Sequence, residues 1–324
     1  MADEVIEVND LKKYFPIQRN FFTKTTLAVH AVDNITFSIR EGETLCLVGE
    51  SGCGKSTAAR TVLRLLEPTS GTIKLKGKDI STLSQQQLWH HRQHMQMVFQ
   101  DPYASLNPRL TAESIISEPL TNYFRIPSDR LREQVRTLLE KVGLRADSIQ
   151  KFPHEFSGGQ RQRLGLARAL ALNPSLIVAD EPVSALDVSV QAQVINLMVK
   201  LQDEMKLAYL FVSHDLAVVE HIGHRVAVMY LGRIVELAAT ADLFNSPLHP
   251  YSQALLDAAP EAKVGVKRVR KVLQGDVPSP INRPSGCHFH TRCPHAMPKC
   301  QTDSPALIAV DDDRWVACHL VAHF

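Results

Sequence analysis

The chain has 324 residues, of which 44% are hydrophobic and 22% are charged, an ordinary composition for a globular protein. Its 36 basic and 34 acidic side chains give a net charge of +2, so electrostatics alone does not favour a nucleic-acid-binding protein. No apolar run approaches the roughly 18 residues needed to span a bilayer, and the acidic first residues lack the layout of a signal peptide. The length allows one large and one smaller domain, or two modest ones, and we expect a cytoplasmic chain that meets any membrane through a partner.

The first forty residues are predicted to form strands. Apolar patterns at residues 5–8 and 31–39 indicate two of them, and Glu41 and Gly42 predict a turn before the next one. Tyr14 lies between the two patterns. From the residues alone, its ring either packs half-buried, which is the commoner role, or offers a face on which a nucleotide base stacks.

A short apolar strand at residues 45–48 leads into the sequence Gly-Glu-Ser-Gly-Cys-Gly-Lys-Ser-Thr at residues 49–57. The spacing Gly, four residues, Gly, Lys, Ser is that of a phosphate-binding loop. Glycines let successive backbone N–H groups turn toward an anion, and the helix expected from about Lys55 adds partial positive charge at its N-terminus. Lys55 can reach the β- and γ-phosphates, and the Ser56 hydroxyl can bind Mg²⁺. The stretch predicts a nucleotide site without indicating what the nucleotide drives.

Helices and short strands are predicted to alternate through the middle of the chain. The expected elements are a helix at residues 56–66, a strand at 72–75, a polar helix at 85–94, a strand at 95–99 and helices within 111–151. The strand at 95–99 ends at Gln100, Asp101 and Pro102.

A second glycine-rich stretch, Ser-Gly-Gly-Gln at residues 157–160, precedes a helical run at 164–172. Such a helix N-terminus can bind an anion. The alternative is an ordinary helix start with Ser157 as the N-cap. That alternative does not explain Gly159, because a glycine inside a helix costs about 1 kcal/mol.

Polar side chains follow two further apolar strands. Residues 176–179 end in Asp180 and Glu181, and a strand at 209–212 ends just before His214. In a doubly wound sheet, ligands bind at the carboxyl edge of the strands. Asp180 is therefore placed to hold Mg²⁺ through water, and Glu181 to polarise an attacking water. A surface acidic pair and a structural histidine are the alternatives.

The last third of the chain begins with a predicted hairpin. Residues 225–230 and 233–237 indicate two strands on either side of a Leu-Gly turn, and helices are expected at 239–244 and 250–258. The basic, proline-bearing stretch 260–283 is interpreted as a linker into a small C-terminal unit.

Four of the six cysteines lie in that C-terminal unit: Cys287, Cys293, Cys300 and Cys318. In a reducing compartment such a group is more often a metal site than a disulfide framework. Two disulfides remain the structural alternative. Nearby histidines able to replace a thiolate are His288, His290, His295 and His319.

Together these motifs resemble the ATP-binding subunits of ABC transporters over about residues 4–258. Residues 49–57 resemble the Walker A loop, and Gln100 resembles the glutamine of the Q-loop. His214 resembles the switch histidine. Tyr14 falls where the family has an aromatic residue that stacks on adenine, so the resemblance favours the stacking role for Tyr14.

The remaining motifs follow in the order of that family. Residues 157–160 resemble the signature, with Phe156 where leucine is commoner. Residues 177–180 resemble Walker B, followed by the catalytic glutamate at Glu181, and 184–187 resemble the D-loop. Any one motif alone could be fortuitous, but the full set in order is specific.

The resemblance implies a P-loop NTPase fold of the α/β class with an antiparallel β subdomain and a helical signature subdomain. The implied domains are an ATP-binding domain at 1–258, with its helical part at about 101–172, and a small cysteine-bearing domain at 259–324. The implied ATP-binding residues are Tyr14, Gly49, Glu50, Ser51, Gly52, Cys53, Gly54, Lys55, Ser56, Thr57, Ser157, Gly158, Gly159, Gln160 and Asp187. The implied catalytic residues are Glu181, His214 and Gln100, and the implied Mg²⁺ residues are Ser56, Gln100 and Asp180.

The region after about residue 248 narrows the resemblance. Residues 249–256, 277–280 and the cysteine segment look like the oligopeptide/dipeptide/nickel importer branch, and within it the second ATPase subunit of dipeptide importers. Importers of nickel, glutathione or another small solute share these features. The resemblance implies a [4Fe–4S] cluster on Cys287, Cys293, Cys300 and Cys318. Four thiolates also suit Zn²⁺, although these spacings lack the close cysteine pairs of zinc fingers.

The resemblance also implies partners. In the family, two ATP molecules lie between two subunits arranged head to tail, and each signature closes on the nucleotide of the opposite subunit. The implied partners are a second, non-identical ATPase, two permease subunits that each insert a helix near residues 101–122, and an extracytoplasmic substrate-binding protein. The implied location is the cytoplasmic face of the inner membrane. Soluble ABC ATPases of ribosomes or DNA repair usually have two nucleotide domains or a long coiled coil, whereas this chain has one signature and no heptad run. A non-hydrolysing regulatory subunit is disfavoured because Glu181 and His214 are present.

Overall fold

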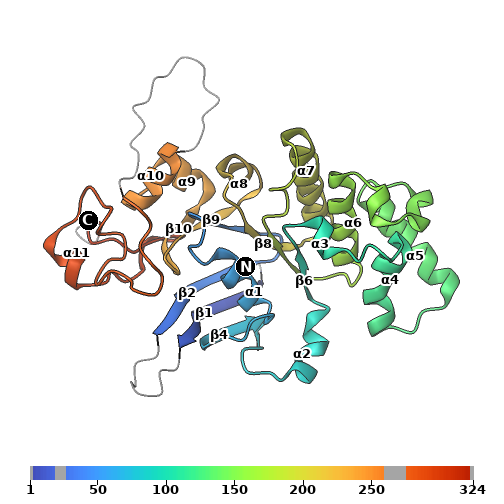
Figure 1. Cartoon of the computed structure of the whole chain (residues 1–324), viewed down its shortest axis with the longest axis horizontal. Coiled ribbons are helices and arrows are strands. Elements are labelled where there is room, and N and C mark those ends of the chain that lie inside the picture. Colours follow the sequence, from blue (N-terminus) through green and yellow to red (C-terminus); the bar gives the residue numbers. More distant parts are fainter. Residues whose placement is uncertain (1–2, 19–26, 259–274, 322–324) are drawn as a thin grey trace, which may run out of the picture. The chain divides into compact units, whose positions relative to one another are not determined.

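The computed structural model describes residues 3–18, 27–258 and 275–321, and its elements are labelled in Figure 1. These residues divide into two compact units. The first unit consists mainly of Thr82–Val212, and the second combines Ile6–Ser38, Thr44–Ser81 and the chain from Ser213 onward.

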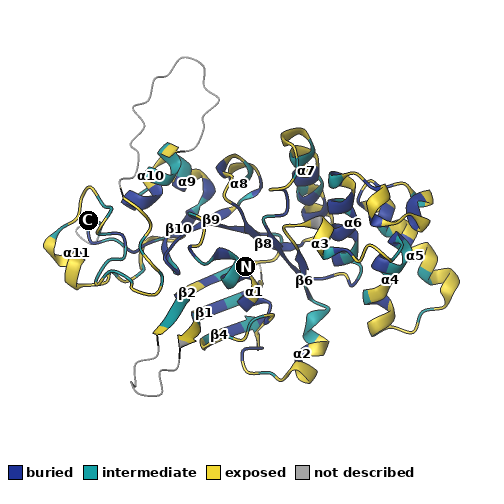
Figure 2. Cartoon of the chain, in the orientation of Figure 1, coloured by how far each residue is buried: buried dark blue, intermediate teal, exposed yellow. Residues whose placement is uncertain are grey.

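The first unit contains three parallel strands: β6 (Met95–Val98), β7 (Leu176–Asp180) and β8 (Ala208–Val212). Every residue of β7 and β8 is buried, and β8 is dark blue in Figure 2. Strands covered on both faces have continuous apolar runs, and this explains why the sequence predicted them clearly.

Helices make up the rest of the first unit. They are α2 (Gln85–Arg92), α3 (Pro102–Ser105), α4 (Ala112–Tyr123), α5 (Ser128–Lys141), α6 (Gly158–Leu170) and α7 (Val188–Met205), with 3₁₀ turns at Ala146–Gln150 and Pro153–Glu155. Side-chain caps define where several of them begin: Ser84 and Ser157 form capping boxes, and Thr111 and Asp187 accept backbone N–H groups. The expected helical part at about 101–172 contains α3 to α6.

The second unit contains two groups of strands. One is a sheet in the order β2 (Leu27–Arg40), β1 (Glu4–Gln18), β4 (Ser70–Leu75) and β5 (Lys78–Asp79), in which β4 pairs antiparallel with both β1 and β5. The other joins β3 (Thr44–Val48) in parallel to β9 (Arg225–Tyr230), followed by the antiparallel strands β10 (Arg233–Ala239), β12 (Arg314–Val316) and β11 (Ile308–Asp311). Its helices are α1 (Lys55–Val62), α8 (Leu216–Ile222), α9 (Thr240–Asn245), α10 (Pro250–Ala258) and α11 (Pro298–Thr302).

The C-terminal residues join the second unit through a strand. Leu237 of β10 lies opposite Trp315 of β12, so the end of the chain extends the sheet that begins with β3. The expected linker at 260–283 lies mostly outside the described residues, as does the proposed boundary at residue 259. The separate C-terminal domain therefore stays a prediction.

Several helices differ from their predicted bounds, and two of the differences have a clear physical reason. The helix expected to reach residue 66 ends at Val62, because Arg64 has a positive φ of 54° and its Nε donates to the Ile80 carbonyl at 3.0 Å. The helical run predicted at 164–172 belongs to α6, which begins earlier, at Gly158, because Ser157 is its N-cap. Neither contact can be recognised from the spacing of apolar residues, so the ends of these two helices were predicted only approximately.

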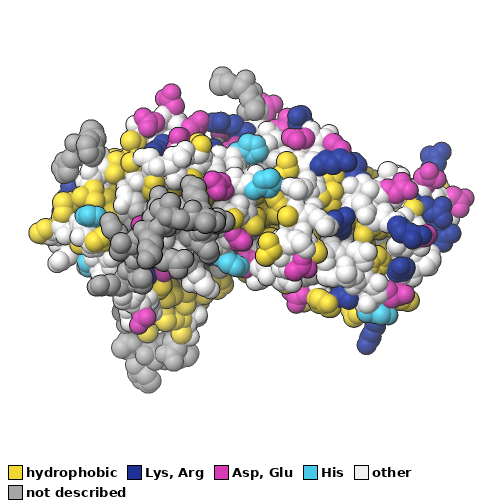
Figure 3. Space-filling model, turned by 90° about the horizontal axis from the view of Figure 1, so that it is seen from above, with side chains coloured by type: hydrophobic (Ala, Val, Ile, Leu, Met, Phe, Trp, Pro, Cys, Tyr) yellow, Lys and Arg dark blue, Asp and Glu magenta, His cyan; other side chains and the backbone are white. Residues whose placement is uncertain are grey.

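No helix within the described ranges is long and apolar enough to cross a membrane. On the face shown in Figure 3, acidic and basic side chains are interspersed.

Candidate nucleotide-binding site

The phosphate loop follows β3, whose five residues are all buried. Gly49 and Gly54 have positive φ angles of 150° and 108°, which side chains rarely adopt. A Cβ on Gly49 would lie 2.2 Å from the Met229 carbonyl oxygen, and one on Gly54 would lie 2.0 Å from that of Ala31. The loop therefore passes so close to neighbouring backbone that only glycine fits at both positions.

Lys55 opens α1 and is only 5% exposed. Its Nζ donates to the carbonyl oxygens of Gly49 at 2.8 Å and Glu50 at 3.1 Å. Three donors on one ammonium allow it to hold the loop carbonyls and to meet an anion. The structure thus places the lysine against the loop, as the motif predicted.

Three neighbouring segments fix the loop from outside. The N–H of Gly232, in the β9–β10 turn, donates to the Cys53 carbonyl at 2.8 Å. The backbone N–H of Glu50 donates to the Tyr251 hydroxyl at 2.9 Å. The Arg292 guanidinium donates two hydrogen bonds to the Glu50 carboxylate, at 2.7 and 3.0 Å. The loop is held by residues from three distant parts of the sequence.

Tyr14 is half-buried in the second unit, with its ring centroid 4.1 Å from that of His30. Its hydroxyl donates to Asp33, and burial raises the pKa of Tyr14 to about 12. Asp33 also accepts from Arg233 at 2.7 Å and Arg283 at 2.5 Å. Burial opposes the charge on Asp33, but hydrogen bonds from Tyr14 and both arginines hold the pKa of that carboxyl well below its usual range. The ring orientation of Tyr14 is thereby fixed.

In the first unit, the structure brings Gln100 and Glu181 together. Gln100 follows β6, and its Nε2 donates to Glu181 Oε2 at 2.9 Å. Glu181 follows β7 and has a positive φ of 47°, an unusual backbone for a side chain of its size. Asp180, immediately before it, is 1% exposed. Strained backbone of this kind is often found at functional sites.

The Ser-Gly-Gly-Gln stretch forms the N-terminus of α6. The Ser157 Oγ accepts the Gln160 N–H at 3.4 Å, and Gln160 Oε1 accepts the Ser157 N–H at 3.0 Å. A Cβ on Gly159 would lie 2.2 Å from Cγ1 of Val190 in α7. The capping role of Ser157 is therefore present, and close helix packing is the physical reason for the second glycine.

Asp187 and His214 occupy the starts of helices. The Asp187 carboxylate accepts Ser189 Oγ at 2.6 Å and the Val190 N–H at 3.0 Å, and these bonds lower its pKa. His214 is exposed and follows Ser213, whose N–H donates to the Leu47 carbonyl of β3 at 3.2 Å. Within the second unit, His214 is thus an exposed residue beside the end of β3, the strand that leads to the phosphate loop.

Comparison with known proteins identifies the family. The ABC transporter family matches residues 32–184, and the family "Oligopeptide/dipeptide transporter, C-terminal region" matches residues 235–300. The oligopeptide transport ATP-binding protein AppF of Bacillus subtilis is 55% identical, over 98% of this chain and 98% of its own length. The dipeptide transport ATP-binding protein DppF of Haemophilus influenzae is 49% identical, over 95% of this chain and 94% of its own.

This chain belongs to the ABC transporter ATP-binding proteins. The fold agrees: a dimeric structure of the ATP-binding cassette MJ0796, bound to ADP and Pi after hydrolysis, has a TM-score of 0.65 and 28% identity, covering 72% of this chain and 98% of that one. The protein cbiO1 of Clostridium perfringens has a TM-score of 0.65 and 27% identity, covering 75% and 92%. The predicted family and its cassette fold are confirmed.

The C-terminal thiols of this ABC protein are not joined as disulfides. Burial raises the pKa of Cys287 to about 11, and the three other C-terminal cysteines lie near enough to act in the same direction. The Cys287 N–H also donates to the Cys300 carbonyl at 2.8 Å. Four adjacent thiols fit a cluster or a zinc ion in number and type. However, across residues 3–18, 27–258 and 275–321 no three His, Cys, Asp or Glu side chains are arranged to hold a metal ion, so the expected cluster has no support from the geometry.

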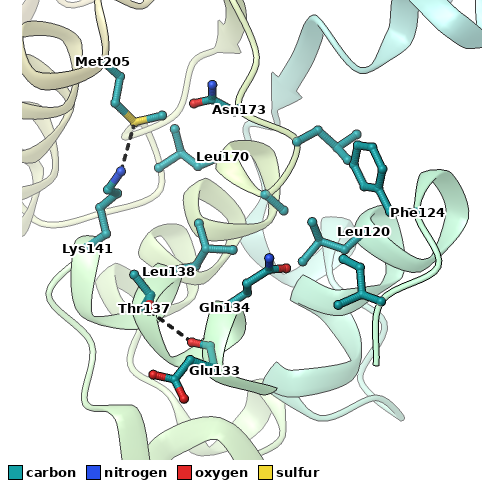
Figure 4. Close-up of a pocket in the computed structure, with 13 residues that line it drawn as sticks. Leu120, Phe124, Glu133, Gln134, Thr137, Leu138, Lys141, Leu170, Asn173 and Met205 are labelled. Atoms are coloured by element: carbon teal, nitrogen blue, oxygen red, sulfur yellow. Dashed lines mark hydrogen bonds between the residues drawn. The ribbon is translucent and has the colours of Figure 1, made fainter. Parts of the chain in front are cut away.

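A separate pocket of about 620 Å³ lies among the helices of the first unit (Figure 4). Leu120, Leu138 and Leu170 give it apolar walls, and Lys141 at its edge donates to the Met205 sulfur at 3.6 Å. None of the expected ATP residues lines it, so the pocket is separate from the nucleotide chemistry.

The residues that hold Tyr14 and the phosphate loop in place could not be recognised from the sequence. Arg292 lies within the cysteine segment, and Asp33 lies inside a predicted strand. Tyr251 was noted only as part of a family-like stretch. None of the three has a local sequence signal, because each acts through a partner far away in the chain.

Proposed function

We propose that this chain is the ATP-hydrolysing subunit of an importer that carries peptides, dipeptides in particular, across the inner membrane. The observation that carries the ATPase assignment is the hydrogen bond between Gln100 and Glu181 at the ends of neighbouring strands. The peptide class rests on the match of residues 235–300 and on the peptide transport relatives. Importers of nickel, glutathione or another small solute are the alternative.

Hydrolysis of ATP needs positioning and charge stabilisation more than covalent help. In this proposal, Lys55 and the loop N–H groups bind the phosphates, and Tyr14 stacks on the base. Ser56, Gln100 and Asp180 offer a hydroxyl, an amide oxygen and a carboxylate, which are the oxygen ligands that Mg²⁺ prefers. When bound, the metal ion neutralises charge on the phosphates.

Glu181 takes the role of general base. Its carboxylate orients the attacking water and accepts its proton, while the Gln100 amide holds one carboxylate oxygen in place. His214 contacts the γ-phosphate in this proposal. These roles follow from position at the strand ends and from the family motifs.

The proposed site is completed by a second chain. Ser157, Gly158, Gly159 and Gln160 would close on ATP bound to a non-identical ATPase partner, while the partner's signature closes on ATP at residues 49–57. The dimeric state of MJ0796 supports such an assembly. Nucleotide binding then biases a two-state interface toward closure, and hydrolysis reopens it.

Two permease subunits and an extracytoplasmic binding protein complete the proposed transporter, with this chain at the cytoplasmic face. The segment 101–122 is proposed to receive a permease helix. Tyr103 within it is 65% exposed, and the Arg161 guanidinium of α6 lies 3.8 Å from its ring centroid. A displacement of Tyr103 by a permease helix would therefore be transmitted through Arg161 to α6, the helix that begins with the signature.

We also propose that Cys287, Cys293, Cys300 and Cys318 hold a [4Fe–4S] cluster, with Zn²⁺ as the alternative. The ground for the proposal is the chemistry of four cysteines that are not joined as disulfides, because the described side chains are not arranged to hold a metal ion. When bound, the group would cross-link the C-terminal segment and stabilise its fold. Anaerobic purification with iron, sulfide and zinc analysis tests this, and one equivalent of zinc without sulfide would exclude the cluster.

The ATPase assignment is tested by Glu181→Gln in the complex assembled with its permeases. We expect ATP binding to be retained and ATP turnover to fall by about 10²–10⁴-fold, the usual contribution of a general base. The matched control is Glu204→Gln, at a side chain 46% exposed on α7, which should leave turnover unchanged. Normal turnover by Glu181→Gln would exclude Glu181 as the base, and a transporter purified with two copies of this chain alone would exclude a non-identical partner.

A further inference from the structure

We propose that Arg292, in the cysteine-bearing segment, is a positioning residue for ATP binding that acts through Glu50 of the phosphate loop. The inference rests on the proposed role of residues 49–57 as the ATP site. It assigns a part in nucleotide affinity to a C-terminal region whose motifs carry no ATP residue.

The Arg292 guanidinium and the Glu50 carboxylate form a bidentate contact. Arg292 Nη1 lies 2.7 Å from Glu50 Oε2, and Nη2 lies 3.0 Å from Oε1. Parallel bonds of this kind fix orientation as well as distance. The Arg292 side chain is only 5% exposed and that of Glu50 is 28% exposed, so solvent screens the pair less than it would a surface pair.

The backbone of Glu50 is tied to the same segment by a second route. Its N–H donates to the Tyr251 hydroxyl at 2.9 Å. The Tyr251 ring packs 5.4 Å from that of Phe289 and 4.7 Å from that of Tyr230, and Phe289 is 1% exposed. Phe289 lies three residues before Arg292, so the segment holds both the side chain and the backbone of Glu50.

The position of Glu50 matters for the phosphates. It lies between Gly49 and the exposed part of the loop, and its carbonyl accepts from Lys55 Nζ at 3.1 Å. A displaced Glu50 would shift both the loop N–H groups and the lysine. Its carboxylate would also repel a nucleotide, and the Arg292 charge offsets that repulsion.

The test uses the assembled transporter and titrates ATP. Arg292→Gln should raise the KM and the Kd for ATP about 10-fold, a change that corresponds to roughly 1.4 kcal/mol of binding free energy. The turnover number at saturating ATP should stay within about 2-fold, because no group that meets the reacting water has changed. Arg292→Lys keeps the positive charge but cannot form the bidentate contact, so its KM for ATP should lie between those of the wild type and Arg292→Gln.

A double-mutant cycle separates positioning from general destabilisation. If Arg292 acts through Glu50, the double variant Glu50→Gln with Arg292→Gln should bind ATP no worse than Arg292→Gln alone. Arg314→Gln breaks the ion pair with Glu236 in the same unit, so it should lower the melting temperature without changing the KM. Arg145→Gln, at a side chain 84% exposed, should change neither.

An unchanged KM for Arg292→Gln, or additive effects in the cycle, would overturn the inference. So would an equal loss of affinity in Arg314→Gln. If the wild-type complex itself bound no ATP, the proposed function would fail instead. If Arg292→Gln does not fold, the Arg292→Lys and Glu50→Gln variants decide the matter by the same titration.

Discussion

Two glycine-rich stretches start helices in this protein, and their glycines serve different purposes. In the phosphate loop, Gly49 and Gly54 have positive φ angles and approach backbone carbonyl oxygens. In the signature, Gly159 lies inside the first turn of α6 and approaches a side chain, Val190. The first stretch is shaped by backbone conformation, and the second by packing of one helix on another.

This difference predicts unequal tolerance to substitution. A backbone carbonyl cannot move without disrupting a strand, whereas a valine methyl group can turn away or be replaced. The phosphate loop should therefore respond to an added methyl group by losing its shape, and the signature should respond by a shift between α6 and α7.

The largest effect is expected for Gly54→Ala. The new Cβ would lie 2.0 Å from the Ala31 oxygen at a φ of 108°, so the loop cannot keep its path. We expect loss of measurable ATP binding by equilibrium titration. The matched control is Gly52→Ala, with φ 80° and nothing within 4 Å, where only backbone strain of about 1–2 kcal/mol applies. Equal binding by the two alanine variants would contradict the role of the carbonyl contact.

A smaller effect is expected for Gly159→Ala. Overpacking against Val190 should destabilise the protein by about 1–3 kcal/mol, measured by denaturant unfolding. Adding Val190→Ala should restore most of the loss by making room. Gly165→Ala in the same helix meets nothing within 4 Å and should stabilise by about 0.4–1 kcal/mol. A failure of Val190→Ala to rescue would show that the glycine is needed for another reason.

The sequence was most informative where chemistry and periodicity are local. The phosphate-loop spacing predicted Lys55 beside its own loop, and the apolar runs predicted β7 and β8 almost to the residue. Gln100 and Glu181 were each predicted just after a strand, whereas the hydrogen bond between them was not predicted. In each case one short stretch contains the whole signal.

Long-range side-chain contacts were not predictable in the same way. Glu50 and Arg292 are 242 residues apart, and Asp33 and Arg283 are 250 apart. The sequence around an arginine does not indicate which carboxylate it will pair with, because the pair is determined by the fold. The same holds for Val190. Its contact explains why residue 159 is a glycine, but that contact exists only when α6 and α7 are packed together.

The turn between β9 and β10 has a practical consequence for labelling and fusion. Leu231 and Gly232 have positive φ angles of 45° and 81°, as in a tight hairpin turn, and such tips usually accept insertions. Here Leu231 is 2% exposed, the Gly232 N–H donates to Cys53, and its carbonyl accepts from Asp33. A tag or reporter inserted at this tip would disturb the hydrogen bond between Gly232 and Cys53 of the phosphate loop. This hairpin is therefore a poor choice for attaching a probe.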